Sequence, residues 1–290
     1  MPLGLQDRLS VGRLFRAYWW QVMVTWGLTL LETALFALMP LLIGRSIDGL
    51  VKNDFTAFWQ LAAVLSALLV VATLRRLYDT RVYGTIRVDL GKVQAARSAA
   101  DPVSTRNARV LMGRELVDFL ERTAPEAMAA VVQVIVAVAV LLTFHGYLAM
   151  TSAGALVLML LIYAVAAPRF FRLNGALNEA SEGQVAALDS HRPRHIAAHF
   201  LRLRKQEVRL SDTESIVYGL IFTVLLAMLC FNIWFAATRL GGSPGTIFSV
   251  VAYSQEFLQS AVQLPIALQA LTRLREISAR ISQVSETGRH

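Results

Sequence analysis

The sequence predicts an all-α, polytopic membrane protein that crosses the bilayer six times, with both termini on the cytoplasmic side. Hydrophobic residues make up 56% of the 290 positions and charged residues only 17%, which is too apolar for a soluble domain of this length. The apolar residues also gather in blocks close to the roughly 20 residues that a helix needs to cross a bilayer. Six such blocks are present: 22–43, 58–74, 127–144, 147–167, 216–238 and 247–267.

The positive charges indicate how these blocks are oriented. The formal net charge is +8, and the cytoplasmic loops of membrane proteins carry an excess of Lys and Arg. With the N-terminus inside, the only Lys and Arg residues outside the cytoplasmic segments are Arg45, Lys52 and Arg239. Those segments are 1–19, 75–126, 168–215 and 268–290. We therefore expect a multi-pass protein of a bacterial-type cytoplasmic (inner) membrane, surrounded by lipid, whose charge orients the chain and requires no nucleic acid.

Long helical stretches join the blocks on the cytoplasmic side. Between positions 58 and 100 only Gly84 and Gly91 interrupt a sequence that favours helix, and Pro102 ends it. A helix of that length spans roughly 64 Å, twice the bilayer core. We expect four such extensions, joined in pairs by cytoplasmic turns near 101–109 and 189–199. The predicted segments are a cytoplasmic N-terminal segment (1–19), a six-helix transmembrane domain (20–267), and a C-terminal cytoplasmic helix and tail (268–290).

Several residues carry a resemblance to a known family. Pro40, Gly44 and Asp48 end the first block at four-residue spacing, the second helix continues through the basic stretch 81–90, and 245–253 opens the last block after Pro244. Together with the long extensions, these features resemble the six-helix transmembrane domain of ABC exporters, the ABC transporter transmembrane region, over residues 15 to 285. The resemblance implies a two-fold homodimer around a central cavity, with the sixth helix lining the substrate path.

The ATPase motifs of such exporters do not occur in this sequence. It has no G-x-x-x-x-G-K-[ST] phosphate loop and no LSGGQ signature. We therefore expect that the chain is not an enzyme, that it holds no cofactor of its own, and that ATP acts only through a separately encoded ATPase subunit.

Polar residues recur along one side of the last block. Their three- and four-residue spacing places them on one helix face; they are Ser249, Tyr253, Glu256, Gln259, Ser260 and Gln263. We predict that this stripe lines a watered substrate cavity, with Glu256 as a substrate-binding or proton-coupling group, because acidic residues within spans are usually functional. The alternative is that the glutamines form interhelical hydrogen bonds in a tight dimer.

Glu32 is the other acidic residue within a predicted span, and no Lys or Arg lies in any of the six blocks. Two interpretations stay open for it. Glu32 is either a proton-coupling group or a neutral carboxyl that is hydrogen-bonded within the bundle.

The two cytoplasmic turns carry the candidate contacts for a partner protein. These are Asp101, Arg106, Arg109, Arg192, Arg194, His195 and His199. His191, His195 and His199 are spaced by four residues and on an unbroken helix could bind a transition metal. Pro193 interrupts that run, and the neighbouring arginines repel a cation, so we expect a basic, partner-facing helix and no metal site.

Three functions remain as hypotheses. In the first, a separate ATPase binds the cytoplasmic turns and drives export through the dimer. In the second, the dimer transports without ATP, coupled to protons through Glu256 or Glu32, as in bacterial peptide transporters that are similar to ABC exporters but lack their ATPase. In the third, the chain is a non-transporting scaffold or regulator that binds a partner through its turns.

Overall fold

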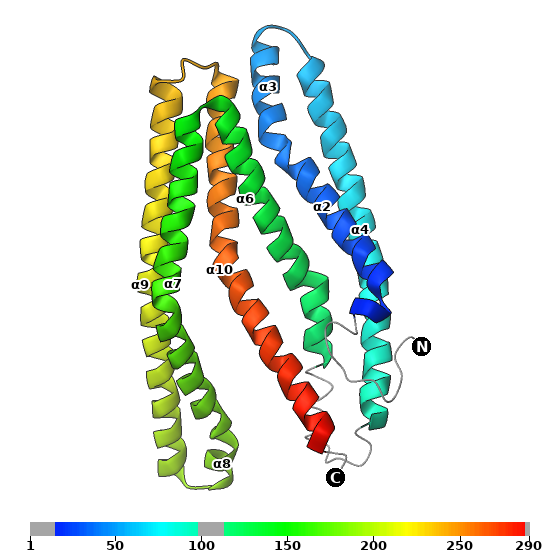
Figure 1. Cartoon of the computed structure of the whole chain (residues 1–290), viewed down its shortest axis with the longest axis vertical. Coiled ribbons are helices and arrows are strands. Elements are labelled where there is room, and N and C mark those ends of the chain that lie inside the picture. Colours follow the sequence, from blue (N-terminus) through cyan, green and yellow to red (C-terminus); the bar gives the residue numbers. More distant parts are fainter. Residues whose placement is uncertain (1–14, 98–112, 288–290) are drawn as a thin grey trace.

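The computed structural model describes residues 15–97 and 113–287, which form an elongated bundle of helices (Figure 1). No β-strand occurs among the described residues, in agreement with the predicted all-α fold. In chain order the elements are α2 (Trp19–Ala37), α3 (Met39–Val51), α4 (Thr56–Arg97), the π-helical turn η1 (Phe119–Thr123), α6 (Ala124–Phe144), α7 (Gly146–Glu182), α8 (Gln184–Asp189), α9 (Pro193–Thr238) and α10 (Pro244–Thr287).

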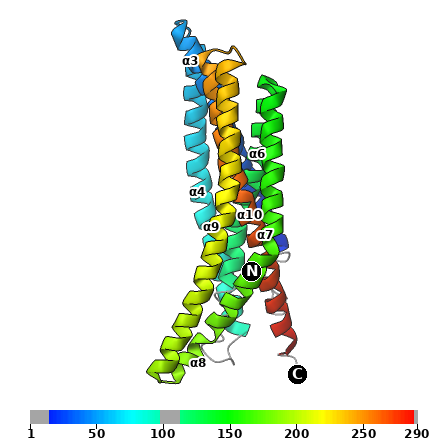
Figure 2. The ribbon, with the colours of Figure 1, turned by 90° about the vertical axis from the view of Figure 1, so that its left-hand side faces the viewer.

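The connections between helices alternate between the two ends of the bundle. Figure 1 shows the α3–α4, α6–α7 and α9–α10 connections at its upper end, and the short helix α8 between α7 and α9 at its lower end. This is the arrangement of short and long connections that the sequence predicts. Figure 2 shows that α8 and the lower end of α9 diverge from the lower end of α10.

Five helical stretches in the described part of the chain are long and apolar enough to cross a membrane. They are Trp19–Val51, Thr56–Ala96, Gly113–Phe144, Gly146–Ser181 and Pro193–Thr238. Helix α10, the sixth predicted span, is not among them, because Gln255, Glu256, Gln259 and Gln263 reduce its hydropathy. The assignment as a multi-pass membrane protein therefore rests on five helices, and a membrane crossing by α10 remains a prediction.

Two of the predicted long helical stretches are present as continuous helices. Helix α4 has 42 residues and α9 has 46, which at 1.5 Å per residue correspond to about 63 and 69 Å. A bilayer core is about 30 Å thick, so each of these helices continues well beyond a membrane that it crosses. Their position in the cytoplasm remains a prediction.

Local sequence explains where several helices begin. Pro193 occupies the first turn of α9, where a residue without an N–H is tolerated. Before α7, the side chain of His145 accepts a hydrogen bond from the backbone N–H of Tyr147. Before α4, Asp54 Oδ1 accepts hydrogen bonds from the hydroxyl of Thr56 at 2.7 Å and from its backbone N–H at 2.9 Å. These two bonds lower the pKa of Asp54 below its usual value, because they stabilise the carboxylate.

Pro40 divides the first predicted span into α2 and α3. Its ring cannot donate a backbone hydrogen bond and opposes the carbonyl one turn earlier. Two side chains of α10 bond to carbonyls at this break: Tyr253 Oη donates to Ala37 at 2.7 Å, and Ser249 Oγ donates to Pro40 at 2.9 Å. The broken first span is therefore held against α10.

Buried apolar side chains form two separate cores. The larger lies among α6, α7, α9 and α10 and includes Leu141, Leu148, Met159, Leu225 and Phe257. The smaller joins the beginning of α2 and the lower part of α4 to residues 116–120, and it includes Val22, Tyr83, Leu90 and Leu120. Burial of each core fixes one side of the bundle, and α6 continues from the smaller core into the larger one.

Near the upper end, α3 and α10 touch through their backbones. A Cβ on Gly44 would overlap the carbonyl of Gly245, and a Cβ on Gly245 would overlap the carbonyl of Gly44. Asp48 accepts a hydrogen bond from the N–H of Gly245 at 2.9 Å and another from the hydroxyl of Ser243. Glycine is therefore required on both helices for this close approach, and Asp48 ties the beginning of α10 to α3.

Candidate functional site

A pocket of about 480 Å³ lies between the first half of α6 and the middle of α10. This volume falls in the range of small-molecule sites. From η1 and α6 the lining residues are Thr123, Glu126, Ala127, Ala129, Ala130 and Gln133, and from α10 they are Gln259, Ser260, Gln263, Ile266 and Ala267.

Helical spacing explains how these residues come to face one another. Glu126 and Gln133 are seven residues apart and therefore lie on one face of α6, two turns from each other. Gln259 and Gln263 are one turn apart on α10, by the same rule. Alanines occupy several of the remaining lining positions, so the space between the two helices stays unfilled.

A hydrogen bond joins the two walls of the pocket. Gln133 Nε2 on α6 donates to Glu256 Oε2 on α10 at 3.4 Å, a long and therefore weak hydrogen bond. Both side chains are half-buried. Glu256 does not itself line the pocket, and its carboxyl meets the lining through Gln133.

The polar stripe predicted on α10 is divided along the helix. Gln259, Ser260 and Gln263 line the pocket. Ser249 and Tyr253 are buried instead against the α2–α3 break, where both donate hydrogen bonds to backbone carbonyls. The upper part of α10 thus packs against the break between α2 and α3, and its middle part contributes side chains to the pocket.

The pocket is acidic and rich in hydrogen-bonding groups. Its lining contains the carboxylate of Glu126 and three glutamine amides, and it contains no Lys, Arg or His. Within the described residues, Glu126, Gln259 and Gln263 have no hydrogen-bond or ion-pair partner in the protein. These groups are therefore available to a ligand, and their charge favours a cation over an anion.

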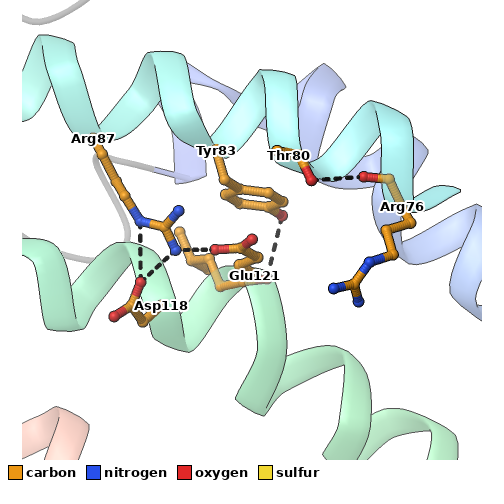
Figure 3. Close-up of polar contacts among 7 residues, drawn as sticks. Arg76, Thr80, Tyr83, Arg87, Asp118 and Glu121 are labelled. Atoms are coloured by element: carbon orange, nitrogen blue, oxygen red, sulfur yellow. Dashed lines mark hydrogen bonds and ion pairs between the residues drawn. The ribbon is translucent and has the colours of Figure 1, made fainter.

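Directly beneath the pocket the chain is wound as a π-helical turn over Phe119–Thr123. In such a turn each carbonyl bonds to the N–H five residues later, and for Leu120 that residue is Pro125, which has no N–H. Tyr83 Oη on α4 donates to the Leu120 carbonyl at 3.2 Å (Figure 3). Trp26 Nε1 on α2 donates to the same carbonyl at 3.4 Å. The two aromatic side chains therefore satisfy the carbonyl that Pro125 leaves without a backbone partner.

Arg87 fastens the same turn to α4. Its Nε and Nη2 lie 3.1 and 2.6 Å from Asp118 Oδ1, and Nη2 also forms an ion pair with Glu121 (Figure 3). One guanidinium thus holds a carboxylate just before the π-helical turn and another within it, a forked geometry to which arginine is suited. The floor of the pocket is positioned by α4 through these contacts.

Substituting phenylalanine for Tyr83 is expected to destabilise the protein by about 1–2 kcal/mol, because the buried Leu120 carbonyl keeps only the longer bond from Trp26. Thermal unfolding in lipid nanodiscs would measure the change. Tyr147→Phe is the matched control, since Tyr147 is exposed and should tolerate the loss of its hydroxyl. Equal stability of Tyr83→Phe and the unaltered protein would contradict the assigned role.

Glu32 lies apart from the pocket and is not isolated. Its Oε2 is 2.6 Å from Arg75 Nε on α4, and Arg75 Nη1 also donates to Thr29 at 3.2 Å. Two turns before Glu32, the hydroxyl of Thr25 donates to Asp79 at 2.7 Å. Arg75 lies one residue beyond the second predicted block, so the absence of Lys and Arg from the blocks did not reveal this basic neighbour. Glu32 and Arg75 therefore link α2 to α4.

Comparison with known proteins places the chain in a family. A model of the ABC transporter transmembrane region matches residues 11–245. The chain belongs to this family. A search of curated proteins found no match.

Membership of the ABC transporter transmembrane family indicates a role in membrane transport. Transmembrane regions of this family generally work with ATPase partners and often as dimers. The match includes the α6 wall of the pocket and ends just after α10 begins at Pro244. The α10 wall is therefore a feature of this chain that the family match does not describe.

The candidate contacts Asp101, Arg106 and Arg109 lie outside the described residues. Arg192 immediately precedes α9, and Arg194 and His195 are exposed in its first turn, beside α8 at the lower end. His199 is half-buried and faces the α7–α8 junction, since a Cβ on Gly183 would lie 3.7 Å from its ring.

The histidines of this turn do not share a helix face. His191 precedes α9, has a positive φ of 51°, and its Nδ1 lies 2.6 Å from the carbonyl of Asp189. Helix α9 begins only after it, at Pro193, so the four-residue spacing does not align His191 with His195. Across the described residues, no group of three His, Cys, Asp or Glu side chains is arranged to hold a metal ion.

Several residues of the site could not be found by following α10 alone. Glu126 immediately precedes the third predicted span and lies seven residues before Gln133, and this spacing was the available signal for a second polar wall. Tyr83, Arg87 and Arg75 act through contacts with distant segments. Nothing in their local sequence marks them, because their partners lie 31 to 46 residues away along the chain.

Proposed function

We propose that the chain is the transmembrane subunit of an ABC-type exporter. In this proposal two copies form a two-fold dimer, α10 completes six membrane spans in each copy, and substrate passes through a cavity between them. An ATPase on a separate chain supplies the driving force from the cytoplasmic, lower end of the bundle.

The pocket between α6 and α10 is the observation that carries the proposal. It presents unpartnered amides and a carboxylate between α6, whose apolar composition assigns it to a membrane, and α10, the sixth predicted span. Polar groups facing lipid are costly, so such a surface requires water, substrate or a second subunit against it. A dimer with the pockets facing its interior meets that requirement, and a monodisperse monomer active in native-like lipid would contradict it.

The ATPase is expected to dock where α8 meets the beginning of α9. Exposed basic side chains gather there at the tip of a helix pair that continues far beyond a bilayer. A rigid helix transmits displacement from its tip to the span, which is the mechanical coupling that an ATP-driven transporter needs. Gly183 and the short helix α8 form the turn that the partner would contact.

Reversing the charge of Arg194 should abolish ATPase binding while the dimer persists, because like charges at a docking surface prevent association. The measurement is affinity purification from native membranes, followed by identification of the co-purified protein and by ATP-dependent transport in vesicles. Arg239→Glu is the matched control: it alters an exposed arginine at the opposite end of the same helix and should leave the partner bound. An ATPase that binds Arg194→Glu as well as the unaltered chain would contradict this docking site.

A proton-coupled transporter of the same fold is the second candidate, and the Glu256–Gln133 contact favours it, since a carboxyl bonded to an amide at the pocket can take up or release a proton. It predicts transport driven by an imposed pH gradient without ATP. Glu256→Gln should remove that transport and keep the fold, because glutamine preserves the shape but cannot exchange a proton. If no ATPase co-purifies and this loss is observed, the second candidate replaces the first.

A further inference from the structure

We propose that the pocket between α6 and α10 selects organic cations that carry several N–H donors, with polyamines and guanidinium compounds as the chemical class. This inference rests on the proposed transport function and names the class of its substrate.

Charge is the first argument. Glu126 lines the pocket, and Glu256 stands behind Gln133 at its edge. Neither carboxylate has an ion-pair partner among the described residues. Arg122 lies one turn before Glu126 but is exposed and outside the lining. A bound cation would meet the unpaired carboxylate of Glu126, whereas an anion would be repelled by it.

Hydrogen-bonding capacity is the second argument. The carboxylate of Glu126 only accepts hydrogen bonds, and the side-chain carbonyls of Gln259 and Gln263 accept more. An ammonium or guanidinium group satisfies such acceptors with charge-assisted bonds. A cation without N–H groups would cover these acceptors without pairing them, which weakens its binding.

Shape is the third argument. Glu126 and Gln133 lie two helical turns apart, which is about 10 Å along α6. Between these polar positions the pocket wall is made of alanines, and Ile266 and Ala267 add apolar surface from α10. A chain with amines separated by methylene groups matches this alternation, since its nitrogens meet the acceptors and its methylenes cover the alanines.

Binding of radiolabelled spermidine to the full-length dimer in nanodiscs tests the proposal. We expect saturable binding that weakens by at least about tenfold in Glu126→Gln, because a charge-assisted hydrogen bond is lost. Gln263→Ala should weaken it less, since one neutral acceptor is removed. Glu179→Gln, an exposed acid on α7, is the matched control and should bind as the unaltered protein does.

Competition separates charge from hydrogen bonding. Unlabelled agmatine should displace spermidine, tetraphenylphosphonium should do so poorly because it has no N–H, and citrate should have no effect. The nanodiscs contain phosphatidylcholine and phosphatidylglycerol, so that no lipid supplies an N–H-bearing cation. A second set contains phosphatidylethanolamine, and displacement of spermidine in that set would identify the lipid headgroup as the source of the cation.

The proposal is overturned if spermidine does not bind saturably, if Glu126→Gln binds it unchanged, or if citrate or tetraphenylphosphonium competes as well as agmatine. These failures differ from a failure of the proposed function. Binding of citrate that Glu126→Gln strengthens would leave a transporter with another substrate class. If spermidine binds as expected but no ATPase co-purifies and vesicles show no transport, the proposed binding site is supported and the proposed exporter function is contradicted.

Discussion

Replacement of Gly245 by alanine is expected to destabilise the protein by about 3 kcal/mol and to separate the upper ends of α3 and α10. The added Cβ would overlap the carbonyl oxygen of Gly44, and it would also press on Asp48, 2.7 Å from its carboxyl carbon. Backbone atoms cannot turn aside as a flexible side chain can, so one helix must move. The hydrogen bond from the Gly245 N–H to Asp48 would be lengthened by the same movement.

Thermal and denaturant unfolding in nanodiscs would measure this loss. Gly154→Ala on α7 is the matched control, because nothing lies within 4 Å of the Cβ it would add. That control should be neutral or stabilising by up to about 1 kcal/mol, since alanine has the higher helix propensity. If both variants unfold alike, the close contact of α3 and α10 does not exist in the folded protein.

Removal of the Arg75 side-chain charge is the second change with a large expected effect. Arg75→Gln leaves Glu32 without its counter-ion in a segment that crosses the membrane, at an expected cost of about 3 kcal/mol. Thr29 loses its bond from Nη1 as well. Glu32→Gln should cost less, because Arg75 would keep its contact with Thr29 and lies near Asp79.

A double-mutant cycle decides whether the two residues act as a pair. The variant that carries both Glu32→Gln and Arg75→Gln should be more stable than Arg75→Gln alone, since no unpaired charge remains and the two amides can bond to each other. The coupling free energy should lie between about 1 and 3 kcal/mol. Strictly additive effects would mean that Glu32 and Arg75 do not interact, and Glu32 would then return as a candidate coupling group.

The fold class and the extents of several helices could be predicted from the sequence, because they depend on local features of the chain. Apolar blocks of membrane length and polar connections are set by composition along the chain, and five of the predicted spans satisfy the same criterion in the structure. Pro193 marks the beginning of α9 because a proline is compatible with the first turn of a helix and not with its interior. The uninterrupted stretch after position 58 became α4, since nothing in it breaks a helix.

The polar stripe of α10 shows where such reasoning stops. Helical periodicity alone determined that Ser249, Tyr253, Gln259 and Gln263 share a face. It could not determine what each part of that face meets, because the neighbour changes along the helix. The α2–α3 break covers Tyr253, and the pocket against α6 receives Gln263.

Only the tertiary structure decided which distant residues complete the site. Gln133 reaches Glu256 across 123 positions of sequence, and Tyr83 reaches the Leu120 carbonyl across 37. The sequence by itself determined the class of protein, the lengths of its helices and the face on which each side chain lies. Which helix faces meet depends on how the helices cross. In this protein the crossings are fixed together by three features: the close contact of Gly44 with Gly245, the π-helical turn before Pro125, and the Glu32–Arg75 ion pair.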